Sequence, residues 1–519
     1  MPALLEVADD GSLGPKRRVR VVDLAALAGL VVLLAFLWGR ARGVLFWVDE
    51  GISVGISSQP FGSIPDVLRQ DGSPPLYYLL LNVWMSLFGS SEAATHILSL
   101  GFALACVPAG LWAGWSLFGR RVGWMCAGLM ALNPFLAYYA NETRMYTLLV
   151  LLGLLATVAF VHAFVFRRRR YLPAFAVCLA LMLYTHNWGI FFGIAAGVSV
   201  LFCAILAEDR LAVIRDAVLA FGGALVLYLP WVPILLDQIA HTGAPFARRP
   251  TLGAIRGDLI GLFGSPETIV ALGLGAALGV AGVVQRPWKR AGLTVVAISI
   301  VPVVVVTVGW LVSRHNSVWH PRYLAVAVAP IAVVLAVGLA RGGRVAVACL
   351  VIYGLLNAPI GVKQLPSQKS NVPLVAEHFA PQLKPGDLVV TDFGRVPLLS
   401  YYLPPGLRYA EATGLVPDPR RTNQRDGTIR LRAADQRVTL LPLVESLPVG
   451  GRILVVCPPI SRLTFDETEF IQLIFTRCTE AETLLGATPG LRLVDKFDAS
   501  PNLTTVHASV QGHLYEKEA

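Results

Sequence analysis

The sequence predicts an α-helical polytopic membrane protein with a small C-terminal α/β domain. Hydrophobic residues fill 55% of the 519 positions and charged residues only 15%, whereas soluble globular domains carry about 25% charged residues. The mean hydropathy is +0.63. The apolar residues form blocks of roughly 17–25, the length that crosses the hydrocarbon core of a bilayer. After the last block the pattern changes to short β-rich runs separated by turns, which is typical of a soluble domain.

About eleven apolar blocks predict transmembrane helices. The first follows basic residues near the N-terminus, but it is too long for the apolar region of a signal peptide, so we expect an uncleaved span. The expected spans cover about 21–39, 94–118, 122–140 and 145–166, a fifth ending near Trp188, a sixth ending near Ala207, a seventh after Arg215, an eighth before Gln285, and then about 291–312, 323–340 and a last span ending near Val362.

The basic residues predict the orientation. Lys and Arg gather in short connectors at 119–121, 167–170, 285–290 and 341–344, and such connectors stay on the cytoplasmic side. The sequence therefore predicts a multi-pass plasma-membrane protein with a cytoplasmic N-terminus (1–20), a transmembrane part (21–362) and an extracytoplasmic domain (363–519). The same pattern accounts for the net charge of +10, so we expect no nucleic-acid partner.

The C-terminal domain is expected to combine short strands with one long helix. Turns precede β-rich runs at 388–391 and 453–457, and further strands are expected at 491–494 and 504–514. Residues 466–485 predict a helix. The segment 417–432 is rich in Arg, Asp, Pro and Gly and predicts a mobile loop.

Two cysteines, Cys457 and Cys478, lie away from the spans. An oxidising compartment would favour a disulfide between them, although their spacing alone does not establish one. No C-x-x-C motif or His/Cys cluster occurs, so we expect no structural zinc site.

Polar residues that fall on the outer side of the predicted topology suggest a functional site. Each one alone could be an ordinary interfacial residue, but ionisable groups at membrane depth usually mark a site when they gather. A partly desolvated carboxylate can take a proton from a hydroxyl, and arginine matches the geometry of a phosphate. The set comprises Asp49, Glu50, Asp71, Asn141, Glu142, Arg144, His186, Asn187, Arg314, His315, His320 and Arg322.

Several motifs in this set resemble those of GT-C-type integral-membrane glycosyltransferases, in particular the protein-mannosyltransferase-like branch. They occur in the family's order over roughly residues 20–345, and any one of them alone is a weak signal. The motifs are Trp47-Val-Asp-Glu50, Asp71-Gly-Ser-Pro-Pro-Leu-Tyr-Tyr-Leu-Leu80, Asn133-Pro-Phe-Leu-Ala-Tyr-Tyr-Ala-Asn-Glu-Thr-Arg-Met-Tyr146, Tyr184-Thr-His-Asn-Trp-Gly189 and His320-Pro-Arg-Tyr-Leu324.

The resemblance implies a GT-C fold, a polyprenyl-phosphate-sugar donor and inversion at the anomeric carbon. It places the active site at the outer leaflet, framed by the first outer loop (41–93) and its membrane-parallel helices, one of them at 75–88. Asp49 would be the catalytic base and Glu50 its neighbour. The remaining implied donor-phosphate or substrate contacts are Arg144, Arg322, Glu142, Tyr146, Asp71, His186, Tyr323 and His320.

The sequence also departs from the family pattern. Ser73 stands where relatives have a histidine that could contact the acceptor or a metal, and Asn141 stands where they have glutamine. We therefore expect no cofactor; a divalent cation stays open but is not indicated.

The sugar and the acceptor do not follow from the motifs. Mannose is the commonest donor sugar among related actinobacterial enzymes, and the Arg-, Ala- and Val-rich composition resembles that of such organisms. Arabinose from a polyprenyl-phospho-arabinose is the alternative. The acceptor is expected to be a cell-envelope glycan, a glycolipid or a protein.

Two interpretations of other classes compete with an enzyme. A transporter or lipid flippase predicts inverted repeats and polar residues at mid-span, whereas the polar residues here gather on one side. A non-catalytic scaffold whose soluble domain binds cell-wall glycan would make Asp49 dispensable.

Overall fold

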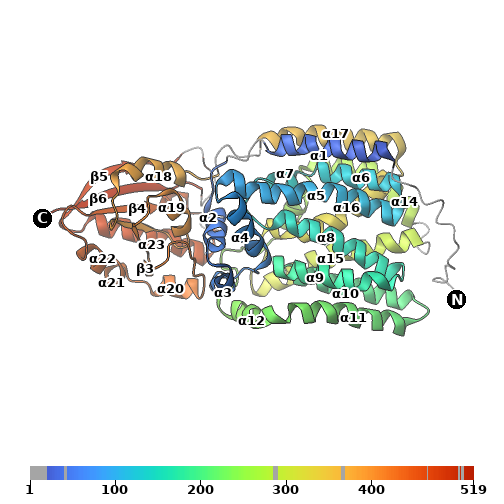
Figure 1. The fold of residues 1–519 in the computed structure, drawn as a ribbon, viewed down its shortest axis with the longest axis horizontal. Coiled ribbons are helices and arrows are strands. Elements are labelled where there is room, and N and C mark those ends of the chain that lie inside the picture. Colours follow the sequence, from blue (N-terminus) through green and yellow to red (C-terminus); the bar gives the residue numbers. More distant parts are fainter. Residues whose placement is uncertain are drawn as a thin grey trace. The chain divides into compact units, whose positions relative to one another are not determined.

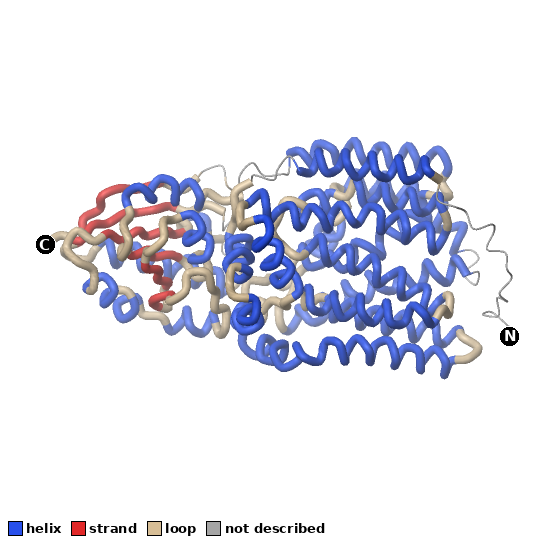
Figure 2. Tube along the Cα trace, viewed as in Figure 1, coloured by secondary structure: helices blue, strands red, loops and turns tan. Residues whose placement is uncertain are grey.

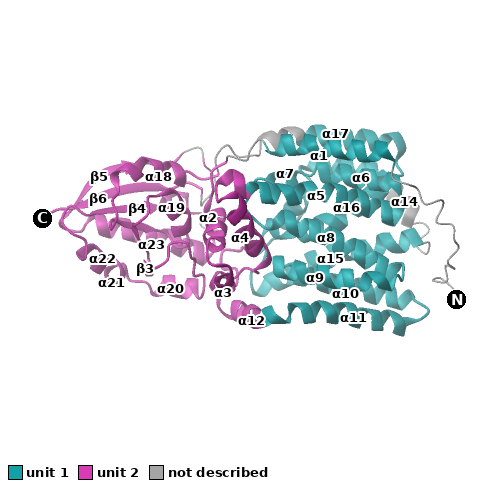
Figure 3. Ribbon diagram, in the orientation of Figure 1, with its two compact units in different colours: residues 1–42, 96–232, 249–365 teal, residues 43–95, 233–248, 366–519 magenta. Residues whose placement is uncertain are grey.

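The computed structural model describes residues 20–39, 44–284, 290–363, 369–464, 466–500, 503 and 508–519. The chain divides into two compact units (Figure 3). Unit 1 comprises residues 1–42, 96–232 and 249–365, and unit 2 comprises residues 43–95, 233–248 and 366–519. Most of the predicted first outer loop and the segment 233–248 therefore fold together with the C-terminal residues.

Unit 1 is built from helices that pack side by side (Figures 1 and 2). Helix α8 packs against α9 and α16, and α10 packs against α15. The helices are α1 (Val21–Trp38), α5 (Glu92–Phe118), α6 (Arg120–Ala131), α7 (Pro134–Tyr139), α8 (Tyr146–Phe160) with the π-helix η3 (Val161–Val165), η4 (Arg169–Tyr171), α9 (Leu172–Thr185), α10 (Gly189–Leu206), α11 (Arg210–Tyr228), η5 (Leu229–Trp231), α13 (Leu252–Gly261), α14 (Pro266–Val284), α15 (Arg290–His315), η6 (Pro321–Leu324), α16 (Ala325–Leu339) and α17 (Gly343–Lys363).

Long apolar helices confirm a membrane protein. Within the described residues, seven helices are long and apolar enough to cross a membrane, or up to eight when the bent pair α13 and α14 counts as one span. They correspond to the first, second, fourth, sixth, seventh, ninth and tenth predicted spans. The number of eleven spans and the orientation stay predictions. The basic residues of 1–19 and 285–289 lie outside the described residues.

Two predicted spans are broken by local chemistry. The span predicted at 122–140 consists of α6 and α7, because Pro134 cannot donate a backbone hydrogen bond and Asn133 caps the second helix. The Asn133 side chain accepts from the backbone N–H of Leu136 at 2.9 Å. The eighth predicted span bends by 72° between α13 and α14, where Gly264 adopts a positive φ of 124° and Pro266 opens the next helix.

Unit 2 contains a six-stranded sheet in the order β3-β2-β1-β4-β6-β5. Strand β1 pairs in parallel with both β2 and β4, and the other pairings are antiparallel. Val389 of β1 lies between Tyr409 and Leu454 in this register. The strands are β1 (Leu388–Thr391), β2 (Arg408–Glu411), β3 (Gly414–Val416), β4 (Arg452–Cys457), β5 (Leu491–Phe497) and β6 (Gln511–Lys517).

Helices cover both faces of this sheet (Figure 1). Alternate residues of the buried strands point to opposite faces, so Val389 and Leu454 join one apolar core while Val390 and Ile453 join another. The helices of unit 2 are α2 (Val48–Ser57), η2 (Phe61–Ser63), α3 (Ile64–Asp71), α4 (Leu76–Phe88), α12 (Val232–His241), α18 (Val372–Phe379), η7 (Ala380–Gln382), α19 (Val396–Tyr402), α20 (Gly427–Ala433), α21 (Gln436–Thr439), α22 (Leu441–Glu445), η8 (Ile460–Arg462) and α23 (Glu469–Gly486).

The predicted elements of this domain are largely confirmed. β1, β4, β5 and α23 lie where the sequence placed them, and Leu76–Phe88 is a helix. The strand predicted at 504–514 begins at Gln511 as β6, and part of 504–510 lies outside the described residues. The prediction of a loop at 417–432 was wrong at its end, because α20 begins at Gly427. The short strands β2 and β3 were missed.

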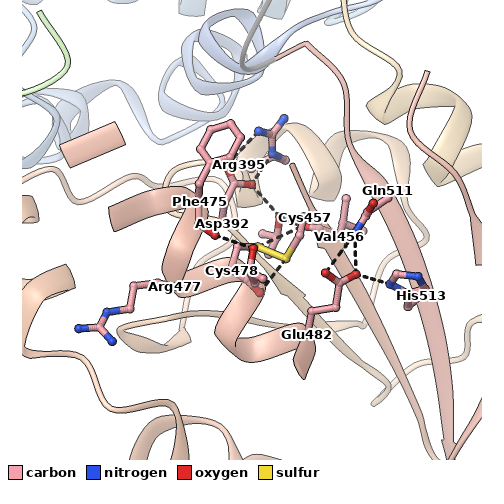
Figure 4. The surroundings of a disulfide bond; sticks show 12 residues. Asp392, Arg395, Val456, Cys457, Phe475, Arg477, Cys478, Glu482, Gln511 and His513 are labelled. Carbon is pink, nitrogen blue, oxygen red and sulfur yellow. Dashed lines mark hydrogen bonds and ion pairs between the residues drawn. A yellow bond between two sulfur atoms is a disulfide. The ribbon is translucent and has the colours of Figure 1, made fainter. Parts of the chain in front are cut away.

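A disulfide joins Cys457 to Cys478, as the sequence allowed (Figure 4). Cys457 ends strand β4 and Cys478 lies in the middle of α23, and both side chains are buried. The bond therefore ties the longest helix of unit 2 to the centre of its sheet. Near it, Asp392 and Arg395 form a buried ion pair after β1.

We expect the double substitution Cys457→Ser/Cys478→Ser to lower the free energy of unfolding of unit 2 by about 3 kcal/mol, because a loop of this length would no longer be closed in the unfolded chain. Pulse proteolysis of the detergent-solubilised full chain measures the change. A reducing agent should destabilise the wild type by a similar amount and leave the double variant unaffected. Equal stability of the oxidised wild type and the variant would contradict the expectation.

Candidate active site

The predicted site residues fall into two groups, one in each unit. Asp49, Glu50 and Asp71 belong to unit 2, and the others belong to unit 1.

In unit 2, Asp49 and Glu50 lie in the first turn of helix α2. The helix begins after Trp47, and unpaired N–H groups at a helix N-terminus stabilise negative charge. Glu50 is fully buried, whereas Asp49 is partly exposed. The carboxylate of Glu50 accepts a bond of 3.0 Å from the ammonium of Lys369, whose side chain is only 5% exposed. Neighbouring carboxylates thus occupy different environments.

Two glycines bring α2 against the C-terminal part of unit 2. A Cβ at Gly51 would lie 2.7 Å from the Cα of Leu398 in α19, and a Cβ at Gly55 would lie 2.5 Å from the carbonyl oxygen of Arg420. Any larger residue would push the helix away. The four-residue spacing places both glycines on one face of α2. This face packs closely against the C-terminal part of unit 2, and the packing fixes the position of the helix that carries Asp49 and Glu50.

The backbone before α2 is held by a relay of hydrogen bonds. The N–H of Phe46 donates to the hydroxyl oxygen of Tyr402 at 2.9 Å, and that hydroxyl donates to Glu92 at 2.7 Å. Phe46 is fully buried in the apolar core that includes Leu398. Hydrogen bonds of the backbone and burial of the Phe46 side chain therefore both fix the segment that leads into α2.

Asp71 ends helix α3 and accepts a hydrogen bond of 3.0 Å from the hydroxyl of Thr422. Gly72 follows with a φ of +98°, where a Cβ would meet Thr242 at 2.9 Å. The side chain of Gln238 donates to the carbonyl oxygens of Leu68 and Ser73. These contacts show a structural use for Asp71, and they anchor the turn that holds Ser73.

In unit 1, a short turn places Arg144 directly before helix α8, which begins at Tyr146. Glu142, in the same turn, is 1% exposed. Arg322 lies in η6, directly before helix α16, and is 9% exposed. Because α8 and α16 pack against each other, these segments bring the arginines to the same tyrosine.

The guanidinium groups of Arg144 and Arg322 are far apart in the sequence but close in space. The guanidinium carbons of Arg144 and Arg322 are 5.9 and 5.8 Å from the centre of the Tyr146 ring. Tyr146 is fully buried and also contacts Tyr139, with 4.7 Å between ring centres. The positive charge of both arginines therefore gathers around one buried aromatic ring.

A second aromatic layer continues from this pair. His186 lies 6.0 Å from Tyr146 and 4.6 Å from Tyr323, measured between ring centres. His320 lies 5.4 Å from Tyr323. The structure thus brings together six predicted residues from three separate motifs: Arg144, Tyr146, His186, His320, Arg322 and Tyr323. Arg314 and His315 of the predicted set are exposed in the last turn of α15.

This arrangement suits an anion. Both arginines precede helix N-termini, where backbone N–H groups point outward and the helix dipole favours negative charge. Arginine presents paired donors that match a phosphate. The aromatic rings supply flat apolar walls beside the charged groups.

The sequence interpretation missed several residues that support the site, chiefly Lys369, Thr422 and Gln238. Lys369 follows the last apolar block and looks like an ordinary flanking cation in the sequence. In the described ranges, no group of three or more His, Cys, Asp or Glu side chains is placed to hold a metal ion. The expectation of no metal stays a prediction.

No protein-family model and no curated protein sequence matches this chain. Solved structures do. ArnT from Cupriavidus metallidurans matches in the apo state with 14% identity and a TM-score of 0.66, covering 95% of this chain and 98% of that chain. The same protein bound to undecaprenyl phosphate matches with 13% identity and a TM-score of 0.64, covering 96% and 98%.

Two further structures are similar. The mycobacterial arabinofuranosyltransferase AftD matches with 15% identity and a TM-score of 0.56, covering 96% of this chain and 40% of that chain. The Archaeoglobus fulgidus oligosaccharyltransferase matches with 12% identity and a TM-score of 0.52, covering 82% and 69%. At these identities the likeness concerns the fold, and it confirms the predicted GT-C fold with a small C-terminal sheet domain.

We expect Lys369→Met to lower the free energy of unfolding of unit 2 by about 3–5 kcal/mol, because it leaves the charge of Glu50 buried without its counter-ion. Glu50→Gln in the same chain should restore most of the loss. Chemical unfolding in detergent, followed by pulse proteolysis, measures both.

Arg432→Met is the matched control. Arg432 pairs with Glu469 in unit 2, but both side chains are more than half exposed (62% and 55%), so its loss should cost less than about 1 kcal/mol. A Lys369→Met variant as stable as this control would show that the buried pair does not hold α2.

Proposed function

We propose that this chain is a membrane glycosyltransferase that moves a sugar from a polyprenyl-phosphate donor to a polar acceptor, with inversion. The observation that carries the proposal is the pair Arg144 and Arg322, which meet at Tyr146 before the N-termini of two packed helices. A phosphate at the end of a lipid is the anion that such a pair at a helix end would recognise.

In this reaction Asp49 accepts the proton of the acceptor hydroxyl. The acceptor oxygen forms a bond to the anomeric carbon while the bond from that carbon to the phosphate oxygen breaks. The electron pair of the broken bond stays on the phosphate, whose negative charge grows. Arg144 and Arg322 stabilise that growing charge more than the ground state, which lowers the barrier.

The environments of Asp49 and Glu50 support this division of roles. Glu50 is buried and forms an ion pair with Lys369. Asp49 is partly exposed in the same helical turn, and a base must exchange its proton with substrate and solvent in each turnover. Glu50 and Lys369 then keep the helix in place.

The comparisons support a lipid phosphate as the leaving group. A structure of the same fold is described with undecaprenyl phosphate bound, and the Archaeoglobus fulgidus oligosaccharyltransferase AglB (10% identity, TM-score 0.50) is described in complex with a dolichol-phosphate. The acceptor would be a cell-envelope glycan, a glycolipid or a protein.

Mannose and arabinose are the two candidate sugars. The motif resemblance favours mannose, and the similarity in fold to an arabinofuranosyltransferase favours arabinose. Incubation of the purified chain with synthetic polyprenyl-phospho-mannose or polyprenyl-phospho-arabinose tests both, through release of the polyprenyl phosphate. The proposal gives no role to a metal ion, and the same assay with a chelator tests that. If labelled lipid crosses the bilayer and no donor is consumed, the chain is a flippase.

We expect Asp49→Asn to lower the turnover number by about 10²–10⁴-fold, because the amide cannot accept the proton. Donor binding and the unfolding temperature should stay close to those of the wild type. Asp66→Asn is the control, since Asp66 is an exposed carboxylate in the first turn of α3 in the same unit. Retention of more than half of the wild-type turnover by Asp49→Asn would remove Asp49 from the mechanism.

For the phosphate contacts, we expect Arg322→Ala and Arg144→Ala each to lower kcat on the order of 10²-fold and also to weaken donor binding. Lysine at either position should restore only part of the loss, because a point charge does not reproduce the paired donors. The control is Arg344→Ala at an exposed position in the first turn of α17. Alanine variants with normal kcat and altered acceptor affinity alone would assign the arginines to the acceptor.

A further inference from the structure

A second basic cluster lies at the other end of helix α8. The continuous helix from Tyr146 to Val165 has 20 residues, which corresponds to about 30 Å, the thickness of a bilayer core. Its first residue is Tyr146, between the arginines of the candidate active site. Its last turn is the π-helix η3, followed by Arg167, Arg168, Arg169 and Arg170.

The backbone at this end is unusual. π-helical turns are rare and often mark functional positions. Arg167 adopts a left-handed conformation with a φ of 56°, which costs free energy for a residue with a side chain. Such a conformation persists only when its surroundings hold it in place.

One buried carboxylate organises part of the cluster. Asp216 of helix α11 is 1% exposed and lies 3.1 Å from Arg167 and 3.1 Å from Arg169, with Arg215 at 3.9 Å. In the part of the chain that the structure describes, the ion pairs of these arginines go to Asp216. Its single negative charge is therefore shared among several cations.

The other arginines stack on aromatic rings. The guanidinium carbons of Arg168 and Arg290 lie 5.8 and 4.1 Å from the centre of the Phe166 ring. Arg168 also donates to Nδ1 of the buried His162 at 3.4 Å. Arg170 stacks on Tyr171 at 5.3 Å. Among the described residues, the partners of Arg168, Arg170 and Arg290 are aromatic rings and an imidazole. These partners carry no negative charge to balance the arginines.

The charge balance of this cluster is strongly positive. Three guanidinium groups share the carboxylate of Asp216, and three more stack on the neighbouring rings of Phe166 and Tyr171. Like charges gathered in this way repel one another. A buried nitrogen, Nη1 of Arg167, also has no hydrogen-bond partner among the described residues. Favourable contacts of cations with helix C-termini involve the last turn only, so they explain one or two of these arginines. An added anion would relieve the repulsion of the rest.

We propose that this cluster binds the phosphate of an acidic glycerophospholipid in the leaflet at this end of α8. The fork of arginine matches a phosphate, and basic pockets between helix ends are known to bind acidic lipid head groups. A lipid fits better than a soluble anion. The cluster lies about one bilayer thickness along α8 from Tyr146, and lipid phosphates are concentrated at that depth. The orientation rule for basic connectors accounts for the charges, but not for their convergence on Phe166 and Asp216. This proposal does not depend on the proposed function.

Native mass spectrometry of the full chain, released from phosphatidylcholine bilayers that contain a minor fraction of phosphatidylglycerol, tests the site. We expect the wild type to retain phosphatidylglycerol. The double variant Arg168→Gln/Arg290→Gln should bind it about 25-fold more weakly, at roughly fivefold for each arginine. The matched control is Arg210→Gln/Arg341→Gln, which removes two exposed arginines outside the cluster and should retain the lipid. Equal retention by the cluster variant and the control would overturn the proposal.

A measurement on the wild type keeps the test independent of how the variants fold. Phosphatidylglycerol should raise the unfolding temperature of the detergent-solubilised chain and phosphatidylcholine should not, because only a bound ligand stabilises the folded state. An equal effect of the two lipids would overturn the proposal. If inorganic phosphate raised the unfolding temperature as much as phosphatidylglycerol does, the cluster would be a site for a soluble anion, and the proposal of a lipid ligand would be overturned.

Discussion

The hydrocarbon core of a bilayer offers no hydrogen-bond partners, and this constraint decides where unit 1 places its polar groups. Helix α8 shows the consequence. The hydroxyls of Thr147 and Thr157 inside it donate to the backbone carbonyls of Ser99 and Gly153, so they cost little in an apolar surrounding. Arginines appear only next to its two ends. The arginines that flank α8 therefore lie beyond its termini, where the chain also exposes backbone donors and acceptors.

Unit 2 meets the opposite requirement, because it must hold charged residues rigidly inside a folded domain. The pair of Glu50 and Lys369 joins positions more than three hundred residues apart in the sequence. A buried pair adds little net stability, but it strongly penalises any arrangement that separates its partners. Together with the close approach of Gly51 and Gly55 to the C-terminal residues, it makes the position of α2 depend on the correct folding of residues 366–519. That dependence gives the C-terminal domain a role in organising the residues next to Asp49.

Sequence patterns predicted the parts of this structure that follow from local rules. Apolar length predicted most long helices, and turn chemistry predicted β1 and β4. The broken span at Asn133-Pro134 could have been predicted from the same rules, since proline after a capping residue begins a helix. The outer-side positions of Arg144 and Arg322 suggested a shared phosphate, but their meeting at Tyr146 was not predicted, because it depends on how α8 and α16 pack. Lys369 could not be found at all, since a lysine after a span is far more often a solvated anchor than a buried counter-ion.

The two ends of α8 also differ in a way that bears on what each can bind. At the Tyr146 end the helix dipole is positive and adds to the charge of Arg144 and Arg322, so an anion there is attracted by both. At the Val165 end the dipole is negative and offsets part of the charge of the arginines that follow. Exposure differs in the same sense: Arg322 is 9% exposed, whereas Arg169 is 56% exposed and screened by water. The same anion would therefore be held more strongly at the Tyr146 end of α8 than at the Val165 end, because dipole and burial add to the charge of the arginines at the first end and offset it at the second.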